Sequence, residues 1–238
     1  MVDFLSSTIE ANREIRELIL NNLGENLHQA ISLGAGGDIS IKIDIVAEEI
    51  FVKYLAQFGN INSEECGFID NNSDYDIVID PIDGSNNFLC NIPFYGTSVA
   101  LKYKGKCIIA VIVNLANEEV FIKDEKRFEK GSLNNLIFRK INNNCYSNFG
   151  LFERAYCSEK TPEILKKYKI KYRSMGALAL SLAYAHDVDF VLFEGKMRAY
   201  DIEAGLYMCE DLNIIKTSNL LLVSKDKEIF DKISQFIL

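Results

Sequence analysis

The chain has 238 residues, of which 48% are apolar and 25% are charged, with only three prolines. This composition is typical of a folded globular protein and excludes a disordered one, and the length suffices for one large domain or two closely packed halves. The formal charge of −8 argues against nucleic acid or an anionic membrane as the main partner.

Neither the N-terminus nor the cysteines indicate export or a zinc site. The first residues contain no basic stretch followed by an apolar core, and no run approaches a membrane span, so we expect a cytoplasmic protein. The six cysteines include no Cys-x-x-Cys pair, which excludes a zinc knuckle or dithiol motif. His28 and His186 leave little basis for a His-rich metal site, and neither lies near a Gly-x-Ser-x-Gly turn.

Helical patterns dominate the start of the chain. Residues 4–23 carry apolar side chains at spacings of three and four, which predicts an amphipathic helix. A glycine-rich segment at residues 34–37, expected to be a mobile loop and not a P-loop, leads into a short strand. Asp44 is expected to open a second helix as its N-cap, and Gly59 to end it.

Strand patterns follow. Residues 77–79 form a short apolar run of the buried kind. Residues 97–103 and 107–113 alternate and are joined by Lys104-Gly105-Lys106, which predicts a hairpin, and residues 119–123 predict a third strand.

A boundary between two halves is expected in the polar, asparagine-rich residues 124–148, which are predicted to be surface connections. The predicted halves are residues 1–145 and residues 146–238. The second half mixes strands and helices, which together with the first half predicts an α+β protein of stacked sheet and helix layers. Its expected strands and extended segments cover residues 154–158, 171–174, 189–193 and 220–223. A short helix is expected to begin at residue 161, and further helices to cover residues 176–186, 202–210 and 228–238.

Chemistry concentrates in residues 75–88, where an apolar strand runs into Asp80-Pro-Ile-Asp83-Gly-Ser85. Two carboxylates ~4 Å apart repel each other by ~4 kcal/mol at an effective dielectric of ~20. Protonation, separation of the two groups or a bound cation must relieve this repulsion. Oxygen-rich turns suit Mg²⁺. The alternative is an ordinary turn whose aspartates bond nearby backbone amides, and this segment alone does not decide between the two.

The acidic residues before this segment would form a metal site only together with other ligands. Glu64 and Glu65 are adjacent at the end of a strand-like piece, so at most one can join a site while the other faces solvent or a salt bridge. An isolated pair of this kind is usually a solvated acidic loop. The carboxylate of Asp44 can cap its helix and face a metal-bound water at the same time.

Four motifs occur in the order found in the inositol monophosphatase family, which the chain resembles over residues 1–210. They are Lys42-x-Asp44, Ser63-Glu64-Glu65, Asp80-Pro-Ile-Asp83-Gly-Ser85 and Arg198-x-Tyr-Asp201-x-x-Ala-Gly205. The glycine-rich segment before them is most similar to archaeal-type members, in which inositol monophosphatase and fructose 1,6-bisphosphatase activities share one site.

The resemblance implies a fold, a reaction and a cofactor. The fold is a layered α-β-α-β-α sandwich of the sugar-phosphatase type, assembled as a homodimer. The reaction is Mg²⁺-dependent hydrolysis of inositol monophosphate or related sugar phosphates, including fructose 1,6-bisphosphate, by a metal-activated water. The phosphoric monoester hydrolase would bind a small phosphorylated polyol or sugar, and neither a nucleic acid polymer nor a membrane.

The same resemblance implies roles for particular residues. Two or three Mg²⁺ ions would be bound by Glu64, Asp80, the Ile82 carbonyl, Asp83 and Asp201. The catalytic set would be Asp44, Glu64 and Ser85, with Asp44 and Ser85 orienting the attacking water. The substrate side would be formed by Asp83, Gly84, Ser85, Glu194, Arg198 and Arg173, where each arginine has a structural ion pair as an equal alternative.

The chain departs from the family pattern in several places. Tyr200 stands where tryptophan is common, and Ser85 keeps the hydroxyl of a frequent threonine without its stiffening methyl group. The chain after Glu210 is short, and residues 124–148 match poorly. These departures affect the expected substrate loops and subunit interface and leave the predicted metal ligands intact.

Two other kinds of site do not fit the spacing of the residues that follow Asp80. A calcium loop counted from Asp80 would place Ser85 at its sixth position and Asn91 at its twelfth, which fails. A phosphoaspartate mechanism is disfavoured because the spacing is Asp-x-x-Asp and not Asp-x-Asp. The remaining alternatives are a phosphatase of 3′-phosphoadenosine 5′-phosphate or NADP, and a non-catalytic metal-binding regulatory homologue.

Overall fold

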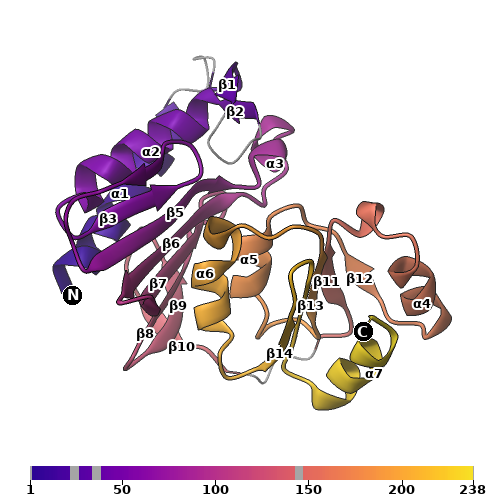
Figure 1. Ribbon diagram of the computed structural model, residues 1–238. Coiled ribbons are helices and arrows are strands. Elements are labelled where there is room, and N and C mark those ends of the chain that lie inside the picture. The colour runs from indigo at the N-terminus through magenta and orange to yellow at the C-terminus, as the bar shows by residue number, and fades with distance from the viewer. Residues whose placement is uncertain (1, 22–26, 34–38, 143–146, 238) are drawn as a thin grey trace.

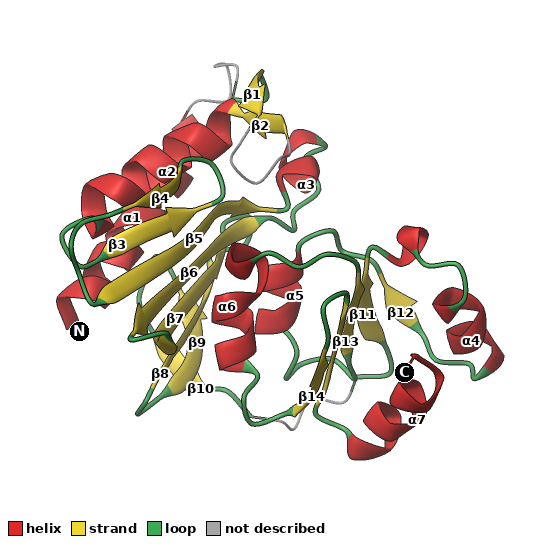
Figure 2. Ribbon diagram, in the orientation of Figure 1, coloured by secondary structure: helices red, strands yellow, loops and turns green. Residues whose placement is uncertain are grey.

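The computed structural model describes residues 2–21, 27–33, 39–142 and 147–237. Helices and sheets alternate in five layers, helix, sheet, helix, sheet and helix, as Figure 1 shows. Figure 2 shows the two sheets, in yellow, with a pair of helices between them. The predicted α+β sandwich is therefore confirmed. The predicted glycine-rich loop at residues 34–37 lies outside the described residues.

The first layer consists of α1 (Val2–Asn21) and α2 (Lys42–Leu55), which pack on each other and on the first sheet. α2 begins at Lys42, so the predicted N-cap at Asp44 is wrong. Ile41, at the end of the short hairpin β1 (Ala30–Leu33) and β2 (Ile39–Ile41), occupies the cap position. Asp44 is the third residue of the helix, and its Oδ2 accepts the Ile41 N–H at 2.8 Å.

The predicted role of Gly59 is also wrong. α2 ends at Leu55 with a right-handed cap at Ala56, and Gly59 does not adopt a positive φ. A Cβ on Gly59 would lie 2.6 Å from the carbonyl oxygen of Tyr75. The glycine is therefore required by the close approach of a neighbouring strand and not by the end of the helix.

The first sheet has eight strands in the order β10-β9-β8-β7-β6-β5-β3-β4. They are β3 (Asn60–Ser63), β4 (Gly67–Ile69), β5 (Tyr75–Asp83), β6 (Gly96–Tyr103), β7 (Lys106–Asn114), β8 (Glu119–Asp124), β9 (Phe128–Ser132) and β10 (Phe138–Lys140). β5 lies between its antiparallel partner β6 and its parallel partner β3. The predicted hairpin and third strand are confirmed in β6, β7 and β8.

The apolar run of β5 is buried on both faces. Ile77 and Ile79 pack toward α1 and α2, whereas Val78 packs toward the helices between the sheets. This two-sided burial explains why the run is continuously apolar.

Two strands lie in the region that was predicted to be surface connections. β9 and β10 extend the first sheet at its edge, with side chains only partly buried. Edge strands need few apolar residues, so their polar composition resembles that of a loop. The chain passes from one sheet to the other after β10, close to the predicted boundary between the halves.

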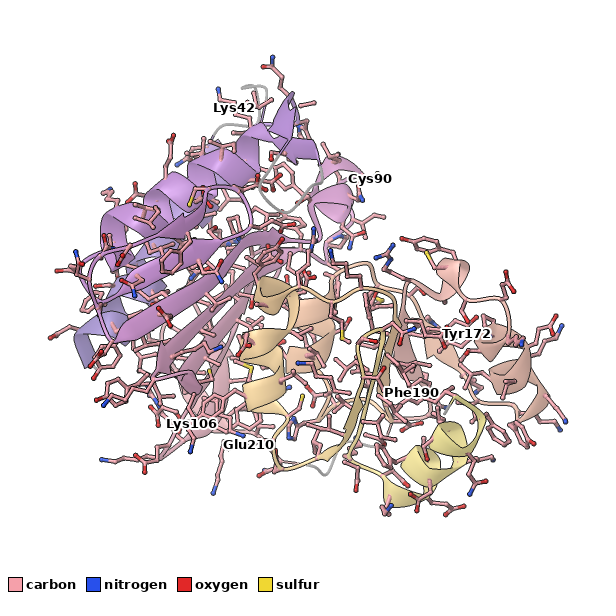
Figure 3. The ribbon with its side chains drawn as sticks, in the orientation of Figure 1. Lys42, Cys90, Lys106, Tyr172, Phe190 and Glu210 are labelled. Atoms are coloured by element: carbon pink, nitrogen blue, oxygen red, sulfur yellow. The ribbon has the colours of Figure 1, made fainter. Side chains whose placement is uncertain are left out.

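The middle layer is formed by α5 (Leu178–Ala183) and α6 (Ala199–Met208). Every residue of α5 is buried because the helix packs on strands of both sheets. α5 is shorter than the predicted helix over residues 176–186, since Gly176 has a φ of +84° and cannot begin a right-handed turn. Side chains fill the spaces between the layers throughout Figure 3.

The second sheet has the order β12-β11-β13-β15-β14 and is covered by α4 and α7. Its elements are β11 (Gly150–Glu153), β12 (Tyr172–Arg173), β13 (Val191–Glu194), β14 (Asn213–Lys216), β15 (Leu220–Ser224), α4 (Thr161–Lys167) and α7 (Lys227–Ile237). β11, β12 and β13 run parallel, so their carboxyl ends point the same way.

The predicted strand over residues 154–158 is wrong by several residues. β11 ends at Glu153, because Arg154 adopts a left-handed conformation with φ of 59° and the short helix η1 (Ala155–Cys157) follows. β14 was not predicted. Among the described residues, no helix is both long and apolar enough to cross a membrane.

Candidate active site

The site is built on the turn that follows β5. A bulge between Asp80 and Asp83 interrupts the pairing with β6, and Gly84 reverses the chain with a φ of +89°. The short helix α3 (Ser85–Leu89) begins directly after it. A Cβ on Gly84 would lie 3.0 Å from both the Ala177 Cβ and the Phe94 carbonyl oxygen, so only glycine fits without strain.

Three carboxylates from distant parts of the chain converge beside this turn. Glu64 follows β3, Asp80 lies near the end of the parallel strand β5, and Asp201 lies in the first turn of α6. One oxygen of each lies within 4.8 Å of the others. Glu64 and Asp80 meet because parallel neighbouring strands end on the same side of a sheet, whereas Asp201 arrives from the helix between the sheets.

The cluster is short of hydrogen-bond donors. Asp80 is only 3% exposed, and its Oδ1 has no hydrogen-bond partner in the described part of the chain. Burial, reinforced by the negative charges of Glu64 and Asp83, raises the pKa of Asp80 well above its usual range. Burial also raises the pKa of Glu64 to about 8, although the Arg198 guanidinium opposes this shift.

Asp83 is also buried, and one of its oxygens has a hydrogen-bond partner. Its Oδ2 accepts the N–H of Leu180 at 2.7 Å, across the boundary between the first sheet and α5. Burial nevertheless raises its pKa to about 8, against the lowering effect of that hydrogen bond.

These carboxylates fit a hard divalent cation. A buried carboxylate oxygen without a donor is costly, and a bound cation would supply the missing partner and reverse the pKa shifts. All the side-chain atoms of the cluster that could bind a metal are carboxylate oxygens. Such ligands suit Mg²⁺ and not a metal that prefers sulfur or imidazole.

Arg198 lies inside this acidic cluster. Its Nη2 is 2.9 Å from Glu64 Oε1, its Nε is 3.2 Å from Asp201 Oδ2, and its guanidinium lies over the ring of Tyr200. The ion pair that was one of its two predicted roles is therefore present. Arg198 links the loop after β3 to the start of α6.

Asp44 and Ser85 form a hydrogen-bonded pair beside the same turn. Ser85 Oγ lies 2.9 Å from Asp44 Oδ1 and 2.9 Å from the carbonyl oxygen of Ile82. The second oxygen of Asp44 accepts the Ile41 N–H, as described above. Burial raises the pKa of Asp44 to about 6, against the effect of these hydrogen bonds.

The remaining predicted residues lie at the second sheet. Glu194 ends β13, and its carboxylate accepts a hydrogen bond from the Thr161 hydroxyl at the start of α4. Arg173 places its guanidinium over the ring of Phe149, and its Nη1 donates to the carbonyl of Tyr172. Tyr172 is labelled in Figure 3 on β12, at the α4 side of the molecule. The contacts of Arg173 thus leave it outside the acidic cluster.

Glu65, the neighbour of Glu64, does not belong to the group of three converging acids. Its carboxylate accepts a hydrogen bond from the Ser40 hydroxyl. The prediction that only one of these adjacent acids joins the cluster is confirmed.

Two further polar residues at the site were missed from the sequence. Glu153 is a buried acid at the end of β11, and Asn87 of α3 donates to two backbone carbonyls beside the turn. The signal for Glu153 was an acid closing the run Gly-Leu-Phe-Glu. The misplaced strand over residues 154–158 hid this signal.

An α-β-α-β-α sandwich that gathers acids from the first sheet and from a helix between the sheets around a buried oxygen-rich centre defines a class of metal-dependent phosphatases. The model of the inositol monophosphatase family matches residues 2–214. The chain belongs to the inositol monophosphatase family, whose members are metal-dependent phosphatases that generally use Mg²⁺.

Archaeal relatives are among the similar proteins. A fructose-1,6-bisphosphatase of Pyrococcus furiosus is 34% identical over 79% of this chain and 74% of its own length. A fructose-1,6-bisphosphatase/inositol-1-monophosphatase of Thermococcus kodakarensis is 30% identical over 91% and 85%. The crystal structure of an inositol monophosphatase-fructose 1,6 bisphosphatase superimposes with a TM-score of 0.80 at 25% identity, covering 97% of this chain and 98% of the other.

A relative with a different name also matches. The bifunctional NADP phosphatase/NAD kinase of Methanococcus maripaludis is 25% identical over 98% of this chain but only 46% of its own length.

Proposed function

We propose that the chain is a Mg²⁺-dependent phosphomonoesterase that hydrolyses inositol monophosphate or a related sugar phosphate, with fructose 1,6-bisphosphate among the candidates. The buried Oδ1 of Asp80, which has no hydrogen-bond partner among the described residues and lies near Glu64 and Asp201, carries this proposal. The names of the archaeal relatives support the substrate class. We also propose that the enzyme is a cytoplasmic homodimer.

The proposed Mg²⁺ ligands are Glu64, Asp80, the carbonyl oxygen of Ile82, Asp83 and Asp201, for two or three ions. When bound, Mg²⁺ would supply an activated water and positive charge to hold the phosphate oxygens. Glu64 and Asp201 would then contribute to binding while Arg198 neutralises part of their charge through the two ion pairs.

Asp44 and Ser85 would direct and deprotonate the attacking water. Asp44 Oδ2 is already bonded to the Ile41 N–H, so Oδ1 is the oxygen that faces Ser85. A proton from the water can pass to Ser85 Oγ while the Ser85 proton moves to Asp44 Oδ1. The pKa of Asp44, raised to about 6 by burial, is near the value that suits a base at neutral pH.

The substrate would lie between the turn and the second sheet. The backbone at Gly84 and Ser85 would help to hold the phosphate, and Asp83 would border the same space. Glu194 would bind substrate hydroxyls after exchanging its Thr161 partner, and Arg198 and Arg173 would lie on the substrate side. For Arg173 this requires its guanidinium to leave the ring of Phe149.

A phosphate-release panel tests the proposal. Inositol 1-phosphate, fructose 1,6-bisphosphate, 3′-phosphoadenosine 5′-phosphate and NADP are each incubated with the protein, with Mg²⁺ and with EDTA. We expect Mg²⁺-dependent release from the first two. NADP is the second candidate, favoured by the match of the NADP phosphatase relative to nearly the whole chain, and preferential release from NADP would select it.

A variant of Asp83 tests the assignment of the site. Asp83→Asn is expected to abolish turnover while the fold is retained, because it removes a proposed ligand without changing side-chain size. Near-normal activity in this variant would contradict the site assignment. Failure of the unmodified protein to release phosphate from any substrate would favour the non-catalytic regulatory homologue.

A further inference from the structure

Glu153 is a buried carboxylate that neither the family motifs nor the proposed mechanism uses. It closes β11 and is only 2% exposed. Three donors surround it: the Gly176 N–H at 2.7 Å, the Ser181 hydroxyl at 2.6 Å and the Met175 N–H at 3.2 Å. The first and third donors are backbone groups of the turn before α5, and Ser181 lies in α5 itself.

The segment that Glu153 holds is the part of the second half that contacts the catalytic turn. Leu180 donates its N–H to Asp83 Oδ2 at 2.7 Å. Asn87, in the helix after the turn, donates its side-chain amide to the Met175 carbonyl at 2.6 Å. Ala177 lies against Gly84, so closely that a Cβ there would be 3.0 Å away.

The contacts form a continuous chain from Glu153 to Asp83. Glu153 fixes the backbone at Met175 and Gly176, and this backbone leads within four residues to the N–H of Leu180. That N–H sets which way the Asp83 carboxylate faces, because it engages one of its two oxygens. The other oxygen is then oriented for a ligand.

We propose that Glu153 is a positioning residue that sets the orientation of Asp83 for Mg²⁺ through the residues 175–180 segment. The inference rests on the proposed function, since it assigns Glu153 to the same metal site. It adds a residue from the second sheet to a centre whose proposed ligands come from the first sheet and α6.

A packing role alone does not account for a carboxylate at this place. Burying the group is costly, and burial raises its pKa while the three hydrogen bonds oppose that shift. An apolar side chain would avoid the cost but would leave the Gly176 N–H without its acceptor. Three donors facing one carboxyl group match its two acceptor oxygens, which no apolar side chain of that size offers.

The test is Glu153→Gln in the full-length chain. The glutamine has nearly the same size, but its amide nitrogen faces a donor where the carboxylate oxygen had accepted one. We expect the Mg²⁺ concentration at half-maximal activity to rise ~10-fold or more, the usual cost of altering a group that orients a metal ligand. The same shift is expected in Mg²⁺ titrations followed by thermal melting, without substrate.

Glu119→Gln is the matched control. Glu119 is a partly buried acid of β8 that accepts the Tyr184 hydroxyl, away from the turn. We expect its Mg²⁺ midpoint to stay that of the unmodified protein, because no group that orients a metal ligand is altered. A Glu153→Gln protein whose melting temperature falls while its Mg²⁺ midpoint stays unchanged would overturn the proposal in favour of a purely structural role.

Asn87→Ser provides an independent variant should Glu153→Gln not fold. It releases the same segment from the opposite side by removing the Met175 contact. A rise in the Mg²⁺ midpoint supports the proposal, and an unchanged midpoint in this folded variant overturns it. If the unmodified protein itself shows no Mg²⁺-dependent melting or activity, the proposed function fails, and that outcome is distinct from a failure of the positioning role.

Discussion

Asp44 and Asp80 are buried carboxylates beside one turn, yet their surroundings differ, so the site has an Asp44–Ser85 side and an Asp80 side. Both oxygens of Asp44 have hydrogen-bond partners, Ser85 and the Ile41 backbone. Asp80 Oδ1 has none within the described residues and is surrounded by further acids. Burial raises the pKa of Asp44 to about 6 and that of Asp80 well above its usual range.

The difference indicates two tasks. The protein itself supplies hydrogen-bond partners for both oxygens of Asp44, which we propose as the proton acceptor. The acids around Asp80 are prepared for a partner that the protein does not supply, and Arg198 neutralises only part of their charge. Variants on the two sides should therefore respond differently to Mg²⁺.

The largest effect is expected from Asp80→Asn. Activity should fall by more than ~100-fold, since removing a ligand costs more than altering a group that orients one. The melting temperature of the metal-free variant at alkaline pH should rise, because a buried unpaired charge is lost. Phosphate release and thermal melting in EDTA measure the two effects.

Asp74→Asn, in the exposed residues before β5, is the control for Asp80→Asn and should change neither quantity. An Asp80→Asn protein that is both active and less stable than the unmodified protein would contradict the distinction between the two sides.

The next effect is expected from Ser85→Ala, on the proton-accepting side. Its kcat should fall by ~100-fold or more, the usual contribution of acid–base catalysis. Its Mg²⁺ midpoint should shift less than that of Asp80→Asn, because Ser85 only contacts a proposed ligand, the Ile82 carbonyl oxygen, and is not itself one. The unmodified enzyme should lose activity as the pH falls and Asp44 is protonated, at a pH below about 6 because bound Mg²⁺ lowers the pKa of nearby carboxylates, and Ser85→Thr should retain this profile. Kinetics across pH and Mg²⁺ concentration provide the measurement. A Mg²⁺ midpoint shifted as far as in Asp80→Asn would mean that Ser85 and Asp80 do not differ in their role toward Mg²⁺.

A moderate effect concerns pH and stability without metal. Glu64 and Asp83 have pKa values of about 8 in the folded protein, above the usual 4.5 and 3.8. The folded state therefore binds more protons than the unfolded chain between about pH 4 and about pH 8, and the free energy of unfolding falls as the pH rises through this window.

Thermal melting in EDTA and in Mg²⁺ tests this pH dependence. Mg²⁺ binds the folded state, so the rise in melting temperature that it causes should be several degrees larger near ~pH 8 than near ~pH 5. A metal-free protein that becomes more stable as the pH rises through this window would show that the acids are compensated by groups other than a cation.

The smallest effect is expected from Arg198→Ala. In EDTA the free energy of unfolding should fall by ~1–3 kcal/mol, because Glu64 and Asp201 lose their paired charge. Saturating Mg²⁺ should restore most of the loss, and Arg198→Lys should show a smaller deficit. Urea unfolding with and without Mg²⁺ measures this, and an equal loss in both conditions would assign Arg198 a purely structural role.

Local patterns in the sequence predicted the elements that build the turn and the acids that surround it. The apolar run of residues 77–79 is continuous because β5 is covered on both faces, and Gly84 marks a backbone reversal that few other residues adopt. Edge strands β9 and β10 escaped prediction, since a half-exposed strand has no apolar pattern to distinguish it from a loop.

By itself the sequence determined which residue types were available and in what order, because acids before and after β5 are visible in the motifs. Only the tertiary structure decided their partners. It placed Arg198 between Glu64 and Asp201, moved Asp44 from the cap to the third position of α2, and brought Glu153 to the turn before α5. Such contacts join residues far apart in the chain, and their geometry depends on how the layers pack.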